Sequence, residues 1–285
     1  MPIDPLPADL VSRVVGAALA EDRAAEDVTT LATVPAELQG TATFLAKEPG
    51  LLAGIEVAFE AFRQMDASVR FGLVASDGSR FERNAPLATV TGPVRALLQA
   101  ERVALNFLQR LSGVSSLTRQ FVDTVADTKA IILDTRKTTP GLRDLEKYAV
   151  RCGGGTNHRR DLAVMAMIKD NHREALVDAE RSLAQGVAAI RARTPGIEVE
   201  VEVDDLADLE AAIAGRPEWV LLDNMSVTQM TEAVRLTAGR AKLEASGGVT
   251  LATVRAIAET GVDAISVGAL THSARALDIS LELNF

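Results

Sequence analysis

The sequence has one cysteine, no long apolar run and no excess of positive charge. Cys152 cannot form an internal disulfide or a cysteine metal cluster, so we expect a reducing compartment and a small buried thiol. No stretch approaches the roughly 18–20 apolar residues that span a bilayer, and residues 1–10 lack the basic and apolar regions of a signal peptide. A formal net charge of −9 argues against general nucleic-acid binding. We therefore expect a cytoplasmic protein that binds neither nucleic acid nor membrane.

The hydrophobic pattern changes character partway along the 285 residues. The first 115 or so mix patterns typical of strands, at 40–47, 50–54, 69–75 and 86–92, with helical patterns at 11–22, 55–65 and 94–112. This mixture indicates an α+β unit. The final residues, 277–285, alternate like a strand and are expected to return to this N-terminal sheet.

After about Lys129, short apolar runs alternate with helical segments. The apolar runs are 130–133, 164–168, 199–203, 219–222, 241–245 and 264–267. The helical patterns between them include 174–192, 205–214, 226–238 and 250–260. Repeated βα units predict parallel strands with right-handed crossovers. Six strands instead of eight leave either an incomplete (β/α) barrel or an open sheet.

Polar residues follow each apolar run, where βα folds place their sites. The residues at these ends are Thr135, Arg136, Lys137, Lys169, Glu202, Asp223, Ser246, Gly247, Gly248 and Gly268. Each could by itself be a helix cap or a solvated side chain, but the whole set favours a site.

Two of these ends have a specific chemistry. Gly247 and Gly248 precede a predicted helix whose first turn includes Val249 and Thr250. Free backbone N–H groups at such a helix start suit a phosphate. The alternative is that Ser246 simply caps the helix, which would give the same sequence pattern. The carboxylates of Glu202 and Asp223 could hold Mg²⁺ against a phosphorylated substrate; general acid–base work or ion pairing are the alternatives.

Positive charge gathers in residues 134–172, although the chain is acidic. This stretch has eight Lys and Arg residues against five Asp and Glu residues. Arg136, Lys137, Arg159 and Lys169 suit an anionic substrate, because guanidinium groups bind carboxylates in a bidentate way and lysine supplies a mobile charge. His158 could hydrogen-bond a substrate carboxylate. Lys169 has a second interpretation as a Schiff-base nucleophile.

Several longer segments resemble one enzyme family. They are ERVALNFLQRLSG (101–113), DTRKTTPGLRDLEKYAVRCGGGTNHR (134–159), IKDNH (168–172), LLDN (221–224), EASGG (244–248) and VGALTHSARALDISL (267–281). These segments look like those of the quinolinate phosphoribosyltransferases, also called nicotinate-nucleotide diphosphorylases (carboxylating). The resemblance is dense over 100–285, and GLLAG at 50–54 extends it into the N-terminal part.

The resemblance implies an N-terminal α/β sandwich, residues 1–115 with the strand 277–285, and a C-terminal incomplete α/β barrel, residues 116–276. It implies transfer of phosphoribosyl from phosphoribosyl diphosphate to quinolinate with loss of CO₂, a step of de novo NAD synthesis that uses Mg²⁺. A homodimer, or a larger assembly built of dimers, is implied as well.

Roles follow from the same resemblance, motif by motif. Quinolinate would meet Thr135, Arg136, Lys137, His158, Arg159 and Lys169, with Lys137 and Lys169 catalytic. Arg102 would enter from the partner subunit. Glu202 and Asp223 would handle Mg²⁺ and the ribose diphosphate, and Ser246, Gly247, Gly248 and Gly268 would cradle the 5′-phosphate.

Three alternatives stay open at this point. A related phosphoribosyltransferase-like protein of molybdate-transport operons could act on another base. A lyase could use Lys169. A barrel without catalysis could sense an anionic metabolite.

Overall fold

The computed structural model describes residues 3–284, which divide into two compact units. The first unit contains residues 3–119, 138–154 and 270–284, and the second contains 120–137 and 155–269. The predicted boundaries, after residue 115 and after residue 276, differ from this division mainly in assigning 138–154 to the second unit.

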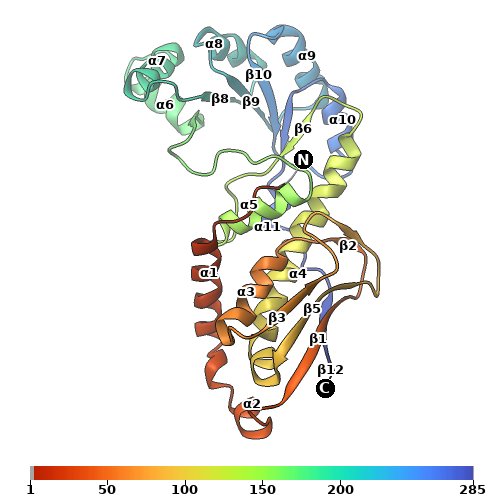
Figure 1. Cartoon of the computed structure of the whole chain (residues 1–285). Helices are drawn as coiled ribbons and strands as arrows, with labels where there is room; N and C mark the ends of the chain where they lie inside the picture. Colours follow the sequence, from red (N-terminus) through yellow and green to blue (C-terminus); the bar gives the residue numbers. More distant parts are fainter. Residues whose placement is uncertain (1–2, 285) are drawn as a thin grey trace. The chain divides into compact units, whose positions relative to one another are not determined.

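The first unit is built around an antiparallel sheet (Figure 1). Its strand order is β12 (Ile279–Asn284), β1 (Gln39–Ala46), β5 (Pro86–Pro93) and β3 (Arg70–Leu73). A second, two-stranded sheet pairs β2 (Gly50–Leu51) with β4 (Arg80–Phe81). The pairing of β12 with β1 joins the end of the described chain to the N-terminal sheet, because Ala46 aligns with Ile279 and Thr41 with Asn284.

Within residues 3–284, five helical segments lie wholly in this unit. They are α1 (Ala8–Glu21), the 3₁₀ turn η1 (Ala24–Glu26), α2 (Val28–Thr33), α3 (Ile55–Met65) and α5 (Arg143–Cys152). Alternate residues of β1 are buried, and Phe44 meets Phe62 of α3 edge to face with ring centroids 6.0 Å apart. Apolar alternation in the strand and 3–4 residue spacing in the helix therefore meet in one core.

Two helices stand where the chain passes from one unit to the other. α4 (Val94–Val125) is longer than the predicted helix 94–112, because buried apolar residues continue through Val114, Phe121 and Val125. The short helix α11 (Ala269–His272) lies at the last passage, back into the first unit.

The second unit is a six-stranded parallel sheet (Figure 1). The order is β6 (Ile131–Leu133), β11 (Ala264–Ser266), β10 (Lys242–Ser246), β9 (Trp219–Asp223), β8 (Val199–Val203) and β7 (Ala166–Ile168). No ladder joins β6 to β7 within residues 3–284, so the sheet stays unclosed. Six parallel strands in an unclosed βα array, beside a separate antiparallel unit, confirm the predicted fold class.

The helices of the second unit follow their strands. They are α6 (Asp170–Asp178), α7 (Leu183–Arg193), the 3₁₀ turn η2 (Leu206–Asp208), α8 (Leu209–Ala214), α9 (Val227–Thr237) and α10 (Val254–Glu259). The prediction of one helix over 174–192 is wrong, because two helices occupy this region. Glu180 has φ 54°, outside the helical range, and Ser182 caps a new helix by accepting the N–H of Gln185.

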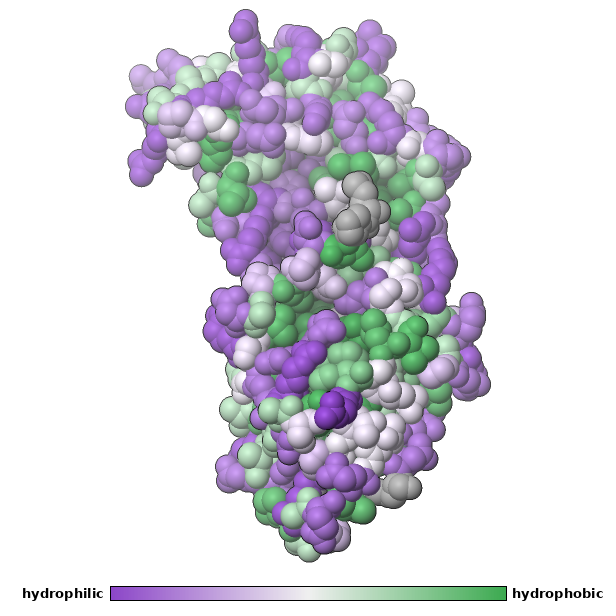
Figure 2. All heavy atoms as spheres, in the orientation of Figure 1, coloured by the Kyte–Doolittle hydropathy of each residue, from purple (hydrophilic) through white to green (hydrophobic). Residues whose placement is uncertain are grey.

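None of the helices within residues 3–284 combines the length and the apolar character that crossing a membrane requires. The face drawn in Figure 2 is largely hydrophilic and is interrupted by hydrophobic patches.

Glu48 links the end of β1 to the approach of β12. Its carboxylate accepts hydrogen bonds from the Arg275 guanidinium, at 2.6 Å, and from the Asp278 N–H, at 2.8 Å. The hydrogen bond from Arg275 is the main cause that lowers the pKa of Glu48 to about 2, against a burial effect of opposite sign.

We expect Glu48→Gln to lower the free energy of unfolding by about 1 kcal/mol at pH 7, a value kept small because Arg275 is exposed. Since folding lowers this pKa, the contribution is complete above about pH 4.5 and is lost as the pH falls toward 2. Urea unfolding between pH 3 and 7 checks this, with Glu37→Gln at an exposed position as control. A difference from wild type that is constant over this range would contradict the assignment.

Candidate functional site

A cavity of about 560 Å³ opens at the carboxyl ends of the parallel strands, entirely within the second unit. Its lining includes eleven of the predicted site residues: Thr135, Arg136, Lys137, His158, Arg159, Lys169, Glu202, Asp223, Ser246, Gly247 and Gly248. Met167, Leu221, Asn224, Glu244 and Ser266 complete the lining. Strand ends that are far apart in the sequence therefore form one pocket.

Two predicted residues are not part of this lining. Gly268 follows β11 without bordering the cavity. Arg102 is an exposed residue of α4 in the other unit, where it borders a separate depression together with Val28 and Leu98.

Strand alternation explains which side chains enter the cavity. Successive residues of a strand point to opposite faces, and parallel neighbours in register share a face. Leu221 of β9 aligns with Glu202 of β8 and with Glu244 of β10. The valines of β8 are buried on the other face, so each glutamate of this strand faces inward.

The cationic side of the pocket contains two arginines whose charges interact. Burial is the main cause that lowers the pKa of Arg159, and the positive charge of Arg136 lowers it further. The Arg159 guanidinium donates to the Met165 carbonyl at 3.1 Å. Because the charge of Arg136 disfavours that of Arg159, an anion bound between or beside these two half-buried guanidinium groups would be stabilised.

Lys169 and Glu202 form an ion pair at neighbouring strand ends. The Lys169 ammonium donates to Glu202, whose side chain is only 12 % exposed, whereas that of Lys169 is 44 % exposed. An exposed ammonium paired with a carboxylate lacks the desolvated surroundings that activate a Schiff-base lysine, so this geometry disfavours the lyase.

Asp134 holds the segment that carries His158 and Arg159. Its buried carboxylate accepts the His158 N–H at 2.8 Å and the Asn157 side-chain amide at 2.7 Å. A strand end is thereby tied to the sequence Asn157–Arg159, 23 residues or more away.

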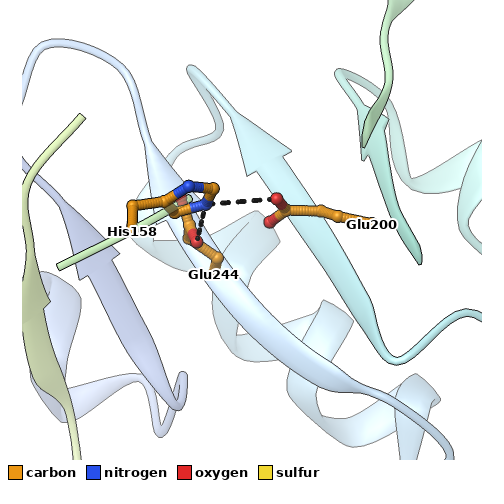
Figure 3. A group of neighbouring side chains, drawn as sticks. All are labelled: His158, Glu200 and Glu244. Carbon is orange, nitrogen blue, oxygen red and sulfur yellow. Dashed lines mark ion pairs between the residues drawn. The ribbon is translucent and has the colours of Figure 1, made fainter. Parts of the chain in front are cut away.

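Below these cations lies a buried cluster of His158, Glu200 and Glu244 (Figure 3). His158 Nε2 is 3.2 Å from Glu200 Oε2 and 3.1 Å from Glu244 Oε2. Burial raises the pKa of Glu200, and the charge of Glu244 raises it further. Burial acts to lower the pKa of His158, but its contacts with Glu200 and Glu244 outweigh burial and raise it. His158 and Glu200 therefore each retain a proton to higher pH than they would alone.

Glu200 and Glu244 were not among the predicted site residues. The sequence does contain a signal for both residues: each is a glutamate inside a segment whose pattern predicts a buried strand, in Val199–Val203 and in Lys242–Ser246. A buried carboxylate requires a hydrogen-bonding or cationic partner. Histidine, which can be neutral or cationic, is one such partner, and the sequence contains only three histidines.

The glycine loop after β10 differs from the prediction. The helix does not begin at Val249 and Thr250, because α10 starts at Val254 and the Thr250 N–H donates to the Thr253 hydroxyl at 3.0 Å. Gly247 and Gly248 adopt φ of 94° and 59°, and the Asn224 N–H donates to the Ser246 carbonyl at 2.9 Å. The glycines therefore form a turn that packs against Asn224. The helix N-terminus that the sequence predicted directly after them, as a site for a phosphate, is not found there.

Two glycine substitutions distinguish close packing from backbone conformation in this turn. A Cβ on Gly247 would lie 2.1 Å from Asn224 Oδ1, whereas a Cβ on Gly248 would meet nothing within 4 Å. We expect Gly248→Ala to cost about 1 kcal/mol for its left-handed conformation and Gly247→Ala to cost clearly more. Urea unfolding of the two variants checks this, and equal losses would contradict the packing role of Gly247.

The chain matches two family models in sequence, described as the N-terminal domain of quinolinate phosphoribosyl transferase, over residues 27–112, and its C-terminal domain, over residues 114–282. It is 45% identical to nicotinate-nucleotide pyrophosphorylase (carboxylating) of Mycobacterium leprae, covering 96% of this chain and 98% of that protein. The structure is similar to NadC from Streptococcus pyogenes, with a TM-score of 0.94, 41% identity and 99% of each chain covered. It is also similar to the nicotinate-nucleotide pyrophosphorylase from Francisella tularensis, with a TM-score of 0.92, 39% identity and 100% and 99% of the two chains covered. The resemblance seen in the sequence is confirmed, and the chain belongs to the quinolinate phosphoribosyl transferase family.

Proposed function

We infer that this protein transfers phosphoribosyl from phosphoribosyl diphosphate to quinolinate with loss of CO₂, giving nicotinate mononucleotide and diphosphate in de novo NAD synthesis. Family membership over nearly the whole chain carries this inference. A pocket with four cationic side chains supports it, because both substrates are polyanions. No observation favours the molybdate-operon protein or the metabolite sensor over this enzyme.

We propose that the pocket's cations bind the two carboxylates of quinolinate. Arg136 and Arg159 offer planar donor pairs that match carboxylate geometry, and Lys137 and Lys169 add point charges. Lys169 is already paired with Glu202, so a substrate carboxylate that binds the Lys169 ammonium would compete with the Glu202 carboxylate. Lys137 and Lys169 are the proposed catalytic residues.

The proposed chemistry follows the charges. The ribose C1–oxygen bond to diphosphate breaks as the quinolinate nitrogen bonds to C1, so the ring becomes a pyridinium. The bond from C2 to its carboxylate then breaks, the electron pair stays on C2 beside the cationic nitrogen, and a proton replaces the carboxyl group. Lys137, Lys169 and the arginines stabilise the anionic groups through fixed positive charge, which is most effective where water is excluded.

Mg²⁺ is the proposed cofactor, and the donor set fits it. Glu202 and Asp223 present carboxylate oxygens, the ligands that Mg²⁺ prefers, at neighbouring strand ends in the same pocket. Two protein carboxylates leave the remaining positions to substrate oxygens and water, which is the usual magnesium arrangement. When bound, Mg²⁺ would neutralise charge on the leaving diphosphate. Ser246, Gly247, Gly248 and Gly268 are proposed to hold the 5′-phosphate.

The proposed assembly is a homodimer, or a larger oligomer built of dimers, in which Arg102 reaches the partner's pocket. Arg102 is exposed and borders a surface depression that Val28, 80% exposed, also lines, so both side chains are accessible to a partner subunit. A cytoplasmic location is proposed as well, since the single cysteine is free and buried.

The direct test supplies quinolinate, phosphoribosyl diphosphate and Mg²⁺ and follows nicotinate mononucleotide and CO₂. We expect product from wild type and a fall in kcat/KM of roughly 100-fold or more for Lys169→Met, because a charge at the reacting groups is lost. Lys242→Met is the matched control, since Lys242 lies at the opposite end of β10 and contacts Trp219. Absence of product from folded wild-type protein that binds quinolinate would contradict the enzyme and favour the sensor. Near-normal turnover by Lys169→Met would remove its catalytic role.

Subunit sharing has its own test. We expect Arg102→Ala and Arg159→Ala to be nearly inactive alone and to regain activity when mixed and allowed to exchange subunits. In a mixed dimer one site carries both defects and the other carries neither. Since random mixing makes half the dimers mixed, activity should reach at most roughly a quarter of wild type for an isologous dimer. Demonstrated exchange without recovery would show that Arg102 does not act across the interface.

A further inference from the structure

The cluster of His158, Glu200 and Glu244 lies at the floor of the pocket and has no role in the proposed function so far. The side chains of His158, Glu200 and Glu244 are 7 %, 0 % and 2 % exposed. His158 and Glu244 border the cavity, whereas Glu200 does not. Figure 3 shows the imidazole pointing toward both carboxylates, which come from different strands.

Both ring nitrogens of His158 already have partners. The Arg159 N–H donates to Nδ1 at 2.8 Å, so this nitrogen acts as an acceptor and carries no proton. Nε2 faces two carboxylates and therefore carries the ring proton.

The same tautomer argues against a metal ion in the cluster. A metal on Nε2 would displace its proton and require one on Nδ1, directly opposite the Arg159 amide hydrogen. Three ligand atoms lie close enough together for a cation, but the hydrogen bond at Nδ1 favours a proton at Nε2.

The second histidine of the basic stretch repeats this arrangement. The Lys169 N–H donates to Nδ1 of His172 at 3.0 Å, and His172 does not border the cavity. Two of the four pocket cations, Arg159 and Lys169, therefore each have their backbone N–H bound to a histidine. His172 accepts a backbone N–H without bordering the cavity, so holding a pocket cation's backbone in this way does not require contact with substrate.

We propose that Glu200 and Glu244, acting through His158, position Arg159 for the substrate carboxylate, and that His158 is a positioning residue instead of a substrate ligand. This proposal rests on the proposed function, because it assigns Arg159 to quinolinate. The carboxylates of Glu200 and Glu244 lie 3.2 Å and 3.1 Å from Nε2 and hold the ring, Glu200 by this contact alone, because neither of its carboxylate oxygens has a hydrogen bond within residues 3–284. The ring fixes the Arg159 backbone through Nδ1, and the Met165 carbonyl fixes the Arg159 guanidinium.

A double-mutant cycle tests the route through Arg159. Calorimetry would measure the Kd for quinolinate in wild type, Glu200→Gln, Arg159→Ala and the double variant. We expect Glu200→Gln to weaken binding roughly 10-fold in wild type and less than about two-fold in the Arg159→Ala background. Glu198→Gln, on the same chain segment but exposed, should leave the Kd unchanged and controls for net charge.

Other outcomes of the cycle overturn the proposal. Equal losses in both backgrounds would show that Glu200 does not act through Arg159. Tighter binding by Glu200→Gln would show that the glutamate acts only by its charge. Thermal unfolding of each variant establishes that it is folded.

A second measurement is independent of quinolinate. Nitrogen-15 NMR of ligand-free protein with labelled histidine should show His158 protonated at Nε2 and unprotonated at Nδ1, with His158→Asn assigning its signals among the three histidines. A proton on Nδ1, or a shift of these signals on adding Mg²⁺ or Zn²⁺ alone, would overturn the positioning role. Failure of wild type to bind quinolinate would contradict the proposed function, and the NMR result would still decide the role of His158.

Discussion

The site at the parallel sheet depends on the balance between its positive and negative side chains. The pocket gathers Arg136, Lys137, Arg159 and Lys169, and such a group of like charges is unfavourable without nearby anions. The sheet supplies those anions from its inner face, where Glu202 binds Lys169 and two deeper glutamates lie beneath His158. A pocket of this kind is preorganised for polyanions because its cations are already held in place before a ligand arrives.

The pattern of β8 shows how a short sequence produces this balance. The sequence of β8 is Val-Glu-Val-Glu-Val. Its valines pack on one face of the sheet, whereas Glu200 and Glu202, which are two residues apart, point to the opposite, inner face. The upper glutamate reaches the pocket and binds a cation, and the lower one is fully buried and contacts His158. One strand thus contributes both to the proposed metal site and to the proposed support of Arg159.

Much of the fold and most of the pocket could be predicted from the sequence, for physical reasons that differ from place to place. Buried parallel strands read as short apolar runs, so all six were found, and the polar residues after them share one edge of the sheet. The break at Glu180 was missed because helical spacing continues across it, and only the local backbone and the Ser182 cap reveal it. Glu200 and Glu244 were missed because a glutamate in a strand is informative only once its neighbours across the sheet are known.

We infer that fixed cations at the strand ends recognise two carboxylates on one ring. Calorimetry at rising salt tests this with quinolinate and with the two pyridine monocarboxylates that each lack one of its carboxyl groups. We expect quinolinate to bind at least roughly 10-fold more tightly than either monocarboxylate and its affinity to fall more steeply with salt, because each carboxylate contributes its own charge-assisted contacts. A monocarboxylate that binds as tightly as quinolinate, with the same salt dependence, would contradict it.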